Sequence, residues 1–137
     1  MSGCIQVVVG EGDAALRQRM VQALERSGYE VREATDGLQL VDQIVESLTQ
    51  RGCEDNMVIV SSVQLAGLSG VDVLTALRCA KWRVPMILIG EGSDRDDIRD
   101  ATQLGAVVIS KPLRDEALLR LVHEAESHQE LQTLGAS

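Results

Sequence analysis

Apolar runs alternate with amphipathic segments five times along the chain, without an internal repeat. The runs are rich in Val, Ile and Leu, and the following segments place apolar residues at helical spacing, which predicts five strand–helix units. Such units predict an α/β doubly wound fold, a parallel sheet with right-handed crossovers and helices on both faces. The predicted strands are 5–9, 29–34, 57–62, 84–89 and 106–109, and the predicted helices follow Asp13 and Gly70 and span 37–51, 94–104 and 114–128.

Local signals set several of these boundaries. Asp13 is an N-cap residue type before the first helix, and Gly28 ends that helix. Pro85 suits the start of a strand better than its middle, because proline cannot donate a ladder hydrogen bond. The 137 residues are enough for one domain with a substantial core. We therefore expect residues 1–128 to form a single domain and 129–137 to be a frayed tail.

The composition indicates a folded, acidic domain with an aliphatic core. Hydrophobic residues make up 45% of the chain, which argues against disorder. Tyr29 and Trp82 are the only aromatic residues, so the core is expected to consist of Val, Leu, Ile, Ala and Met, as is usual for a parallel sheet covered on both faces. The net charge of −8, with no basic stripe, argues against a nucleic-acid partner.

The cysteine pattern and the hydropathy of the chain predict its cellular location. Cys4, Cys53 and Cys79 are odd in number and have no C-x-x-C spacing, which favours reduced thiols over a disulfide framework or a zinc site. The sequence shows neither a signal peptide nor an apolar run of membrane-spanning length. These observations predict a cytoplasmic protein without a membrane partner.

One segment carries a family resemblance. Residues 57–77, MVIVSSVQLAGLSGVDVLTAL, form an apolar run, a loop and the start of an amphipathic helix. This segment resembles the third strand, acceptor loop and third helix of a response-regulator receiver domain, which has the CheY-like fold. Gly67 and Gly70 keep the family spacing, Ala66 replaces the usual proline, and Ser62 stands where the phosphorylated aspartate is expected. The resemblance covers nearly the whole chain and implies a single five-stranded sheet of order 2-1-3-4-5.

The resemblance also implies where the other receiver residues should lie. A working receiver places an acidic pair after strand 1, the acceptor Asp after strand 3, Thr or Ser after strand 4, an aromatic residue in strand 5 and Lys-Pro after it. Most of these residue types are replaced here. In chain order the matching positions are Glu11 and Gly12 (with Asp13 one step beyond), the degenerate acceptor Ser62, the former switch positions Gly90 and Val108, and the retained pair Lys111-Pro112.

These replacements change the expected chemistry. Mg²⁺ prefers hard oxygen ligands, usually including carboxylates, and here Glu11 supplies one, Gly12 none and Ser62 only a hydroxyl. Glu11 and Asp13 are open to two interpretations: residual metal binding, or a helix cap by Asp13 and an ion pair between Glu11 and Lys111. We favour the second, and expect neither a bound metal nor another cofactor.

Lys111 needs a different anion when no phosphoryl group is present. Glu11 and Glu91 are the candidates, since a partly enclosed ammonium is costly when unpaired; the alternative is a solvated lysine. The resemblance implies a cis bond between Lys111 and Pro112.

A competing motif supports a different class of protein. Gly10 to Ala15 matches G-x-G-x-x-G/A between a strand and a helix, and Glu33 follows near the distance of a ribose-binding acid. A nucleotide-binding α/β domain using the Gly10–Gly12 loop is therefore the alternative. Glu11 and Asp13 count against it, because they would put two carboxylates beside a pyrophosphate.

The sequence thus predicts a degenerate receiver, or pseudo-receiver, that acts through protein–protein interaction without aspartyl phosphorylation. No enzymatic activity is expected, because neither His123 nor His128 has a nucleophile partner that spacing supports. The expected partner is a signalling protein whose identity the sequence does not give, and a homodimer is compatible with it.

Overall fold

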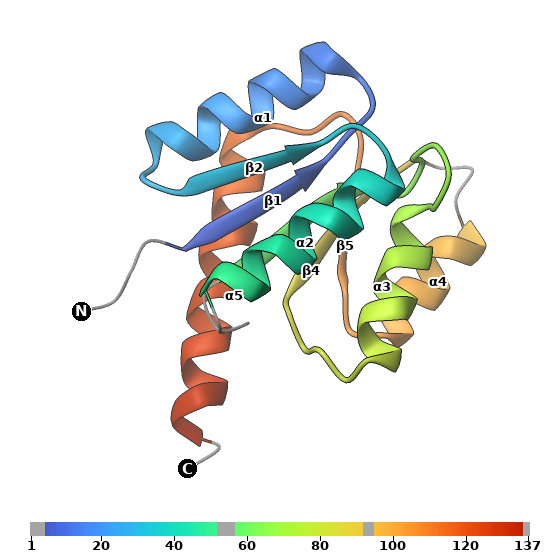
Figure 1. Cartoon of the computed structure of the whole chain (residues 1–137). Coiled ribbons are helices and arrows are strands. Elements are labelled where there is room, and N and C mark those ends of the chain that lie inside the picture. The colour runs from blue at the N-terminus through green and yellow to red at the C-terminus, as the bar shows by residue number, and fades with distance from the viewer. Residues whose placement is uncertain (1–4, 52–56, 92–94, 136–137) are drawn as a thin grey trace.

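A computed structural model describes residues 5–51, 57–91 and 95–135. Its five strands form one parallel sheet of order β2-β1-β3-β4-β5 (Figure 1), which confirms the predicted doubly wound fold. Each observed strand begins within two residues of its predicted start. The strands are β1 (Gln6–Gly10), β2 (Glu30–Ala34), β3 (Met57–Ser62), β4 (Met86–Gly90) and β5 (Val107–Ser110).

Each strand is followed by a helix, as the alternating pattern predicted. The helices are α1 (Ala14–Arg26), α2 (Gly37–Arg51), α3 (Gly70–Cys79), α4 (Arg95–Gln103) and α5 (Asp115–Gly135). The predicted end of the last helix at His128 was wrong, and residues 129–135 continue α5 instead of fraying. The sequence offers a reason, since no Gly or Pro interrupts the helix before Gly135.

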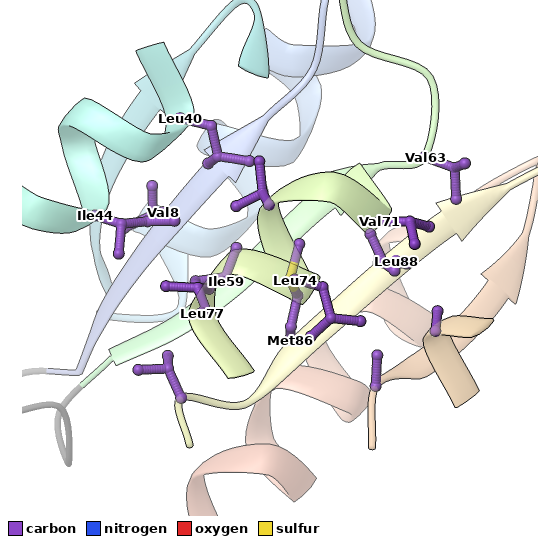
Figure 2. Close-up of a cluster of buried hydrophobic side chains, with 14 of the residues drawn as sticks. Val8, Leu40, Ile44, Ile59, Val63, Val71, Leu74, Leu77, Met86 and Leu88 are labelled. Carbon is purple, nitrogen blue, oxygen red and sulfur yellow. The ribbon is translucent and has the colours of Figure 1, made fainter. Parts of the chain in front are cut away.

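The core has two layers, one on each face of the sheet. Alternate residues of β1 separate them: Val7 and Val9 face α1 and α5, whereas Val8 faces α2, α3 and α4. Figure 2 shows the second layer, in which Leu40 and Ile44 of α2 and the aliphatic side chains of α3 pack on β1, β3 and β4. As predicted, both layers are built almost entirely from aliphatic residues and Met.

Burial along the strands follows their positions in the sheet. The central strands β1, β3 and β4 are buried throughout, which explains why their sequences are nearly continuous apolar runs. The edge strands β2 and β5 are partly exposed. Within the described residues, none of the helices combines the length and the apolar character that crossing a bilayer requires.

The strand register determines which residues meet at the carboxyl edge. Gly10 lies opposite Ser61, Ser62 opposite Ile89, and Gly90 opposite Ser110. Because all strands run in the same direction, the residues that end or follow β1, β3, β4 and β5 lie along one edge of the sheet.

Candidate functional site

Glu11 is the centre of the carboxyl edge. It directly follows β1, and only 4% of the residue is exposed. The Ser62 hydroxyl donates a hydrogen bond to its Oε1, and the Asp13 amide donates to its Oε2 at 3.0 Å. The Glu11 amide donates to Ala34 O at 3.0 Å, which anchors the backbone of this residue to the end of β2. Both carboxylate oxygens therefore already have protein donors.

Lys111 lies between two carboxylates. Its Nζ is 3.8 Å from Glu11 Oε1 and 3.8 Å from Glu91 Oε1. The predicted pairing with one of these two carboxylates is confirmed, and the structure shows it with both. These distances exceed the 2.7–2.9 Å or so of a charge-assisted hydrogen bond, so the contacts are charge pairs without direct hydrogen bonding. The Lys111 amide donates to Gly90 O at 3.1 Å, and the bond to Pro112 is cis, as predicted.

Ser62 is enclosed at the end of β3. Only 1% of the residue is exposed, and its hydroxyl is committed to Glu11. Its carbonyl accepts a hydrogen bond from Ser61 Oγ at 2.9 Å and lies against Gly70 at the start of α3. A Cβ on Gly70 would be 2.5 Å from that carbonyl oxygen, so the close approach of α3 to β3 requires glycine here.

The two former switch positions provide packing and no polar group. Gly90 is buried at the end of β4 and has no side chain to contact a phosphoryl group. Val108 is half-buried and packs against the core layer that contains Leu88, Ala101 and Ala106. Neither Gly90 nor Val108 therefore supplies a hydroxyl or an aromatic ring to the edge.

The arrangement does not fit a Mg²⁺ ion of the receiver type. Asp13 Oδ1 accepts the Leu16 amide at 3.1 Å and thereby caps α1, as predicted, while Gly12 has no ligand atom. Both oxygens of Glu11 are engaged by Ser62 and Asp13. Among the described residues, no group of three or more His, Cys, Asp or Glu is placed to hold a metal.

The Gly10–Gly12 loop has a packing role in this fold. A Cβ on Gly10 would be 3.0 Å from Leu40 Cδ2, so the small residue allows α2 to approach β1. The amides of Glu11 and Asp13, which a pyrophosphate would need, already donate to Ala34 O and to Glu11 Oε2. Glu33, the candidate ribose acid, instead pairs with Arg17 at 3.2 Å.

Arg17 is a contributor that sequence reasoning missed. Its Nη1 donates to Glu11 O at 2.8 Å, and its Nε contacts Glu33 Oε1 at 3.2 Å, so it joins α1 to the ends of β1 and β2. The available signal was weak, because a basic residue one turn into a helix is ordinarily a solvated side chain. His123 is exposed and lies on α5, away from the edge residues in sequence; the side chain of His128 lies outside the described residues, as do Cys4 and Cys53.

Comparison with known proteins gives a consistent family match. A family model described as the response regulator receiver domain matches residues 7–123. The transcriptional regulatory protein FixJ of Bradyrhizobium diazoefficiens is 26% identical over 120 residues, which are 87% of this chain and 55% of FixJ. Nodulation protein W of the same species is 32% identical over 118 residues, or 85% of this chain and 48% of that protein. The chain thus spans about half the length of these curated relatives.

Solved structures show the same fold at lower identity. A CheY-like receiver domain protein from Methanospirillum hungatei superposes with a TM-score of 0.80 at 19% identity, covering 95% of this chain and 99% of that one. The chemotaxis response regulator CheY4 of Vibrio cholerae gives 0.73 at 21% identity, covering 90% and 99%.

Proposed function

This chain belongs to the response regulator receiver family, and we propose that it is a receiver that signals by protein–protein interaction without aspartyl phosphorylation. The observation that carries the proposal is the contact at the acceptor position, where the Ser62 hydroxyl donates to the buried Glu11 carboxylate. This contact replaces the free acceptor carboxylate of a working receiver.

The chemistry of Ser62 supports the proposal. An acyl phosphate forms only on a carboxylate, whereas phosphate on a hydroxyl is an ester that requires removal of the hydroxyl proton. The Ser62 proton is engaged by Glu11, and the hydroxyl is almost fully buried, so a phosphodonor has no open approach. The Glu11 carboxylate contacts Ser62, but Ser62 and Asp13 donate to both of its oxygens.

The residues at the two switch positions support the same conclusion. A phosphorylation switch needs a side chain that moves to contact the new phosphoryl group. It also needs a part of the fold with two conformations, whose populations this movement changes. Gly90 offers no hydroxyl, and Val108 is an aliphatic side chain packed on the core. We infer that partners recognise one resting surface of this domain, and that the signal depends on the presence of the protein instead of its phosphorylation state.

The proposal includes the class of partner. A signalling protein is favoured over nucleic acid because the chain has a net charge of −8. A homodimer is compatible with the same proposal. The proposal assigns no enzymatic activity to the domain and places it in the cytoplasm, which the cysteine pattern favours.

Intact-protein mass spectrometry tests the proposal directly. Wild-type protein is incubated with Mg²⁺ and acetyl phosphate, beside a receiver domain that has Asp at the acceptor position as positive control. We expect no added mass of one phosphate on the wild type while the control is labelled. Ready, Mg²⁺-dependent labelling of the wild type would end the proposal, and the Ser62→Ala variant would then show whether Ser62 is the acceptor.

A further inference from the structure

A hollow of about 740 Å³ opens beside Lys111, between the first turns of α1 and the β5–α5 loop. Three cationic side chains line it from different segments: Arg19 from α1, Lys111 after β5, and Arg114 before α5. Leu16 and Leu113 supply apolar surface between them. We call this hollow the Lys111 pocket. Its volume lies in the range of about 300–1,000 Å³ that is typical of small-molecule sites.

The Lys111 ammonium retains hydrogen-bonding capacity toward this pocket. Within the part of the chain that the structure describes, Nζ is 3.8 Å from Glu11 Oε1 and from Glu91 Oε1, beyond hydrogen-bond distance in both cases. The Lys111 side chain is 32% exposed, and Glu91 is 59% exposed. An oxyanion in the pocket can therefore reach the ammonium in competition with the exposed Glu91, while the contact with the buried Glu11 is kept.

Arg19 gives the pocket a fixed cationic group. Arg19 Nη2 donates to Leu113 O at 2.5 Å, and Arg19 Nε is 3.4 Å from Asp115 Oδ1. These contacts hold the guanidinium against the β5–α5 loop, so the side chain loses little further entropy when a ligand binds. Arg114 is exposed at the rim. The lining residues carry three cations and one carboxylate, Glu91. Asp115 and Glu11, which pair with Arg19 and Lys111, are not lining residues.

We propose that the Lys111 pocket binds a small organic oxyanion, a carboxylate or a phosphate monoester that carries an apolar group. Lys111 and Arg114 would bind the charged end, while the apolar group packs on Leu16 and Leu113. Binding involves no group transfer and no change at Ser62. It is therefore independent of the proposed function, and it would give a receiver that cannot be phosphorylated a non-covalent input.

A titration of the ¹⁵N-labelled full chain followed by NMR tests the proposal. The probes are phenyl phosphate, benzoate and benzyl alcohol, which share a six-membered ring and differ in charge and head group. We expect saturable shifts of the Leu16, Arg19 and Leu113 amides with one or both anions, and none with benzyl alcohol. The anion that binds more tightly identifies the head group, phosphate or carboxylate. Intact mass after the titration should be unchanged, which separates binding from phosphorylation.

Three variants locate the site. Lys111→Gln should weaken the anion about tenfold, because it removes a charge-assisted contact. The exposed Arg114→Gln should weaken it by about threefold and leave the fold intact. Arg99→Gln removes an exposed cation on α4 and should leave the affinity unchanged.

Equal shifts with benzyl alcohol, equal weakening by Arg99→Gln, or no saturable shift with either anion would overturn the proposal. So would binding of an acidic peptide alone, since that would make the pocket a partner surface.

Discussion

The Ser62 hydroxyl donates a hydrogen bond to Oε1 of Glu11, and this bond joins the ends of β3 and β1 at the carboxyl edge of the sheet. Both residues are buried, with 1% and 4% of their surfaces exposed. A hydroxyl and a carboxylate thus satisfy each other at the carboxyl edge of the sheet.

Removal of this hydrogen bond should destabilise the domain. Ser62→Ala removes the hydroxyl donor to Oε1 of the buried Glu11 carboxylate and leaves the ammonium of Lys111 3.8 Å away from it. Loss of a donor to a buried charged group costs about 1–3 kcal/mol in the free energy of unfolding, which urea denaturation would measure. Ser110→Ala, an exposed serine at the end of β5, is the matched control and should change the stability little. Equal stability of both variants and the wild type would show that the Ser62–Glu11 bond contributes nothing.

Gly70 should be difficult to replace by any larger residue. A Cβ at this position would lie 2.5 Å from Ser62 O and 2.7 Å from Leu88 Cδ2, and backbone cannot move aside as easily as a flexible side chain. We expect Gly70→Ala to lower the free energy of unfolding by about 1–3 kcal/mol. In Gly12→Ala the nearest atom, Thr35 O, is 3.5 Å away, so this control should be nearly neutral. Similar urea midpoints for the two variants would contradict the close packing of α3 on β3.

Much of this architecture could be predicted from the sequence because short-range rules determine it. Continuous apolar runs predicted the central strands, and the bounds of α2 at Gly37 and Arg51 agree with its predicted span. The capping role of Asp13 required only its residue type and the next turn of helix. The pairing of Lys111 with Glu11 or Glu91 was predicted from the receiver resemblance, which implied the strand order that places these residues along one edge.

What could not be predicted depends on side-chain directions across the fold. The contacts of Arg17 with Glu11 O and Glu33 depend on how α1 is rotated against the sheet. The donation by Ser62 depends on the rotamers of two residues separated by 51 positions in the chain. The extension of α5 to Gly135 was missed because its later turns lack a clear apolar periodicity, although nothing in them breaks a helix.

Tyr29 should make stability depend on pH in the alkaline range. Its hydroxyl donates to Glu126 Oε2 at 3.1 Å; burial, followed by the charge and hydrogen bond of Glu126, raises the pKa of Tyr29 from 10 to about 12. The folded state therefore holds this proton more tightly than the unfolded state. The contribution to stability is fully present below pH 10 and is lost as pH rises through about 12.

Two measurements check this pH dependence. Tyr29 is the only tyrosine, so tyrosinate absorbance reports its titration directly, and we expect a midpoint well above 10. Tyr29→Phe should flatten the decline in the free energy of unfolding between pH 10 and 12, without altering its dependence at lower pH. A midpoint near the ordinary value of 10 would show that the Glu126 contact does not form in solution.

The charged surface of α4 is a candidate for partner recognition. Arg95, Asp96 and Arg99 are all exposed, and the Arg99–Asp96 pair at 3.5 Å is too solvated to contribute much to the fold. If partners bind here, the double charge reversal Arg95→Glu/Arg99→Glu should weaken capture of a partner, and added salt should weaken the wild-type complex. Arg26→Glu on α1 serves as the control. Unchanged affinity of each identified partner for the double variant would exclude α4 as the binding surface.

Restoration of phosphorylation should require more than one substitution. Ser62→Asp returns a carboxylate to the acceptor position, but Gly12 still supplies no ligand for a metal, and Gly90 supplies no hydroxyl for the product. Loss of one key electrostatic contact at a reacting centre typically costs about 3 kcal/mol, or roughly a hundredfold in rate. We therefore expect Ser62→Asp to remain unlabelled by acetyl phosphate with Mg²⁺ in intact-protein mass spectra. The triple variant Gly12→Asp/Ser62→Asp/Gly90→Thr should be labelled more than Ser62→Asp alone. Efficient labelling of the single variant would mean that the missing metal ligand and hydroxyl are not what prevents phosphoryl transfer, and that the identity of residue 62 alone is decisive.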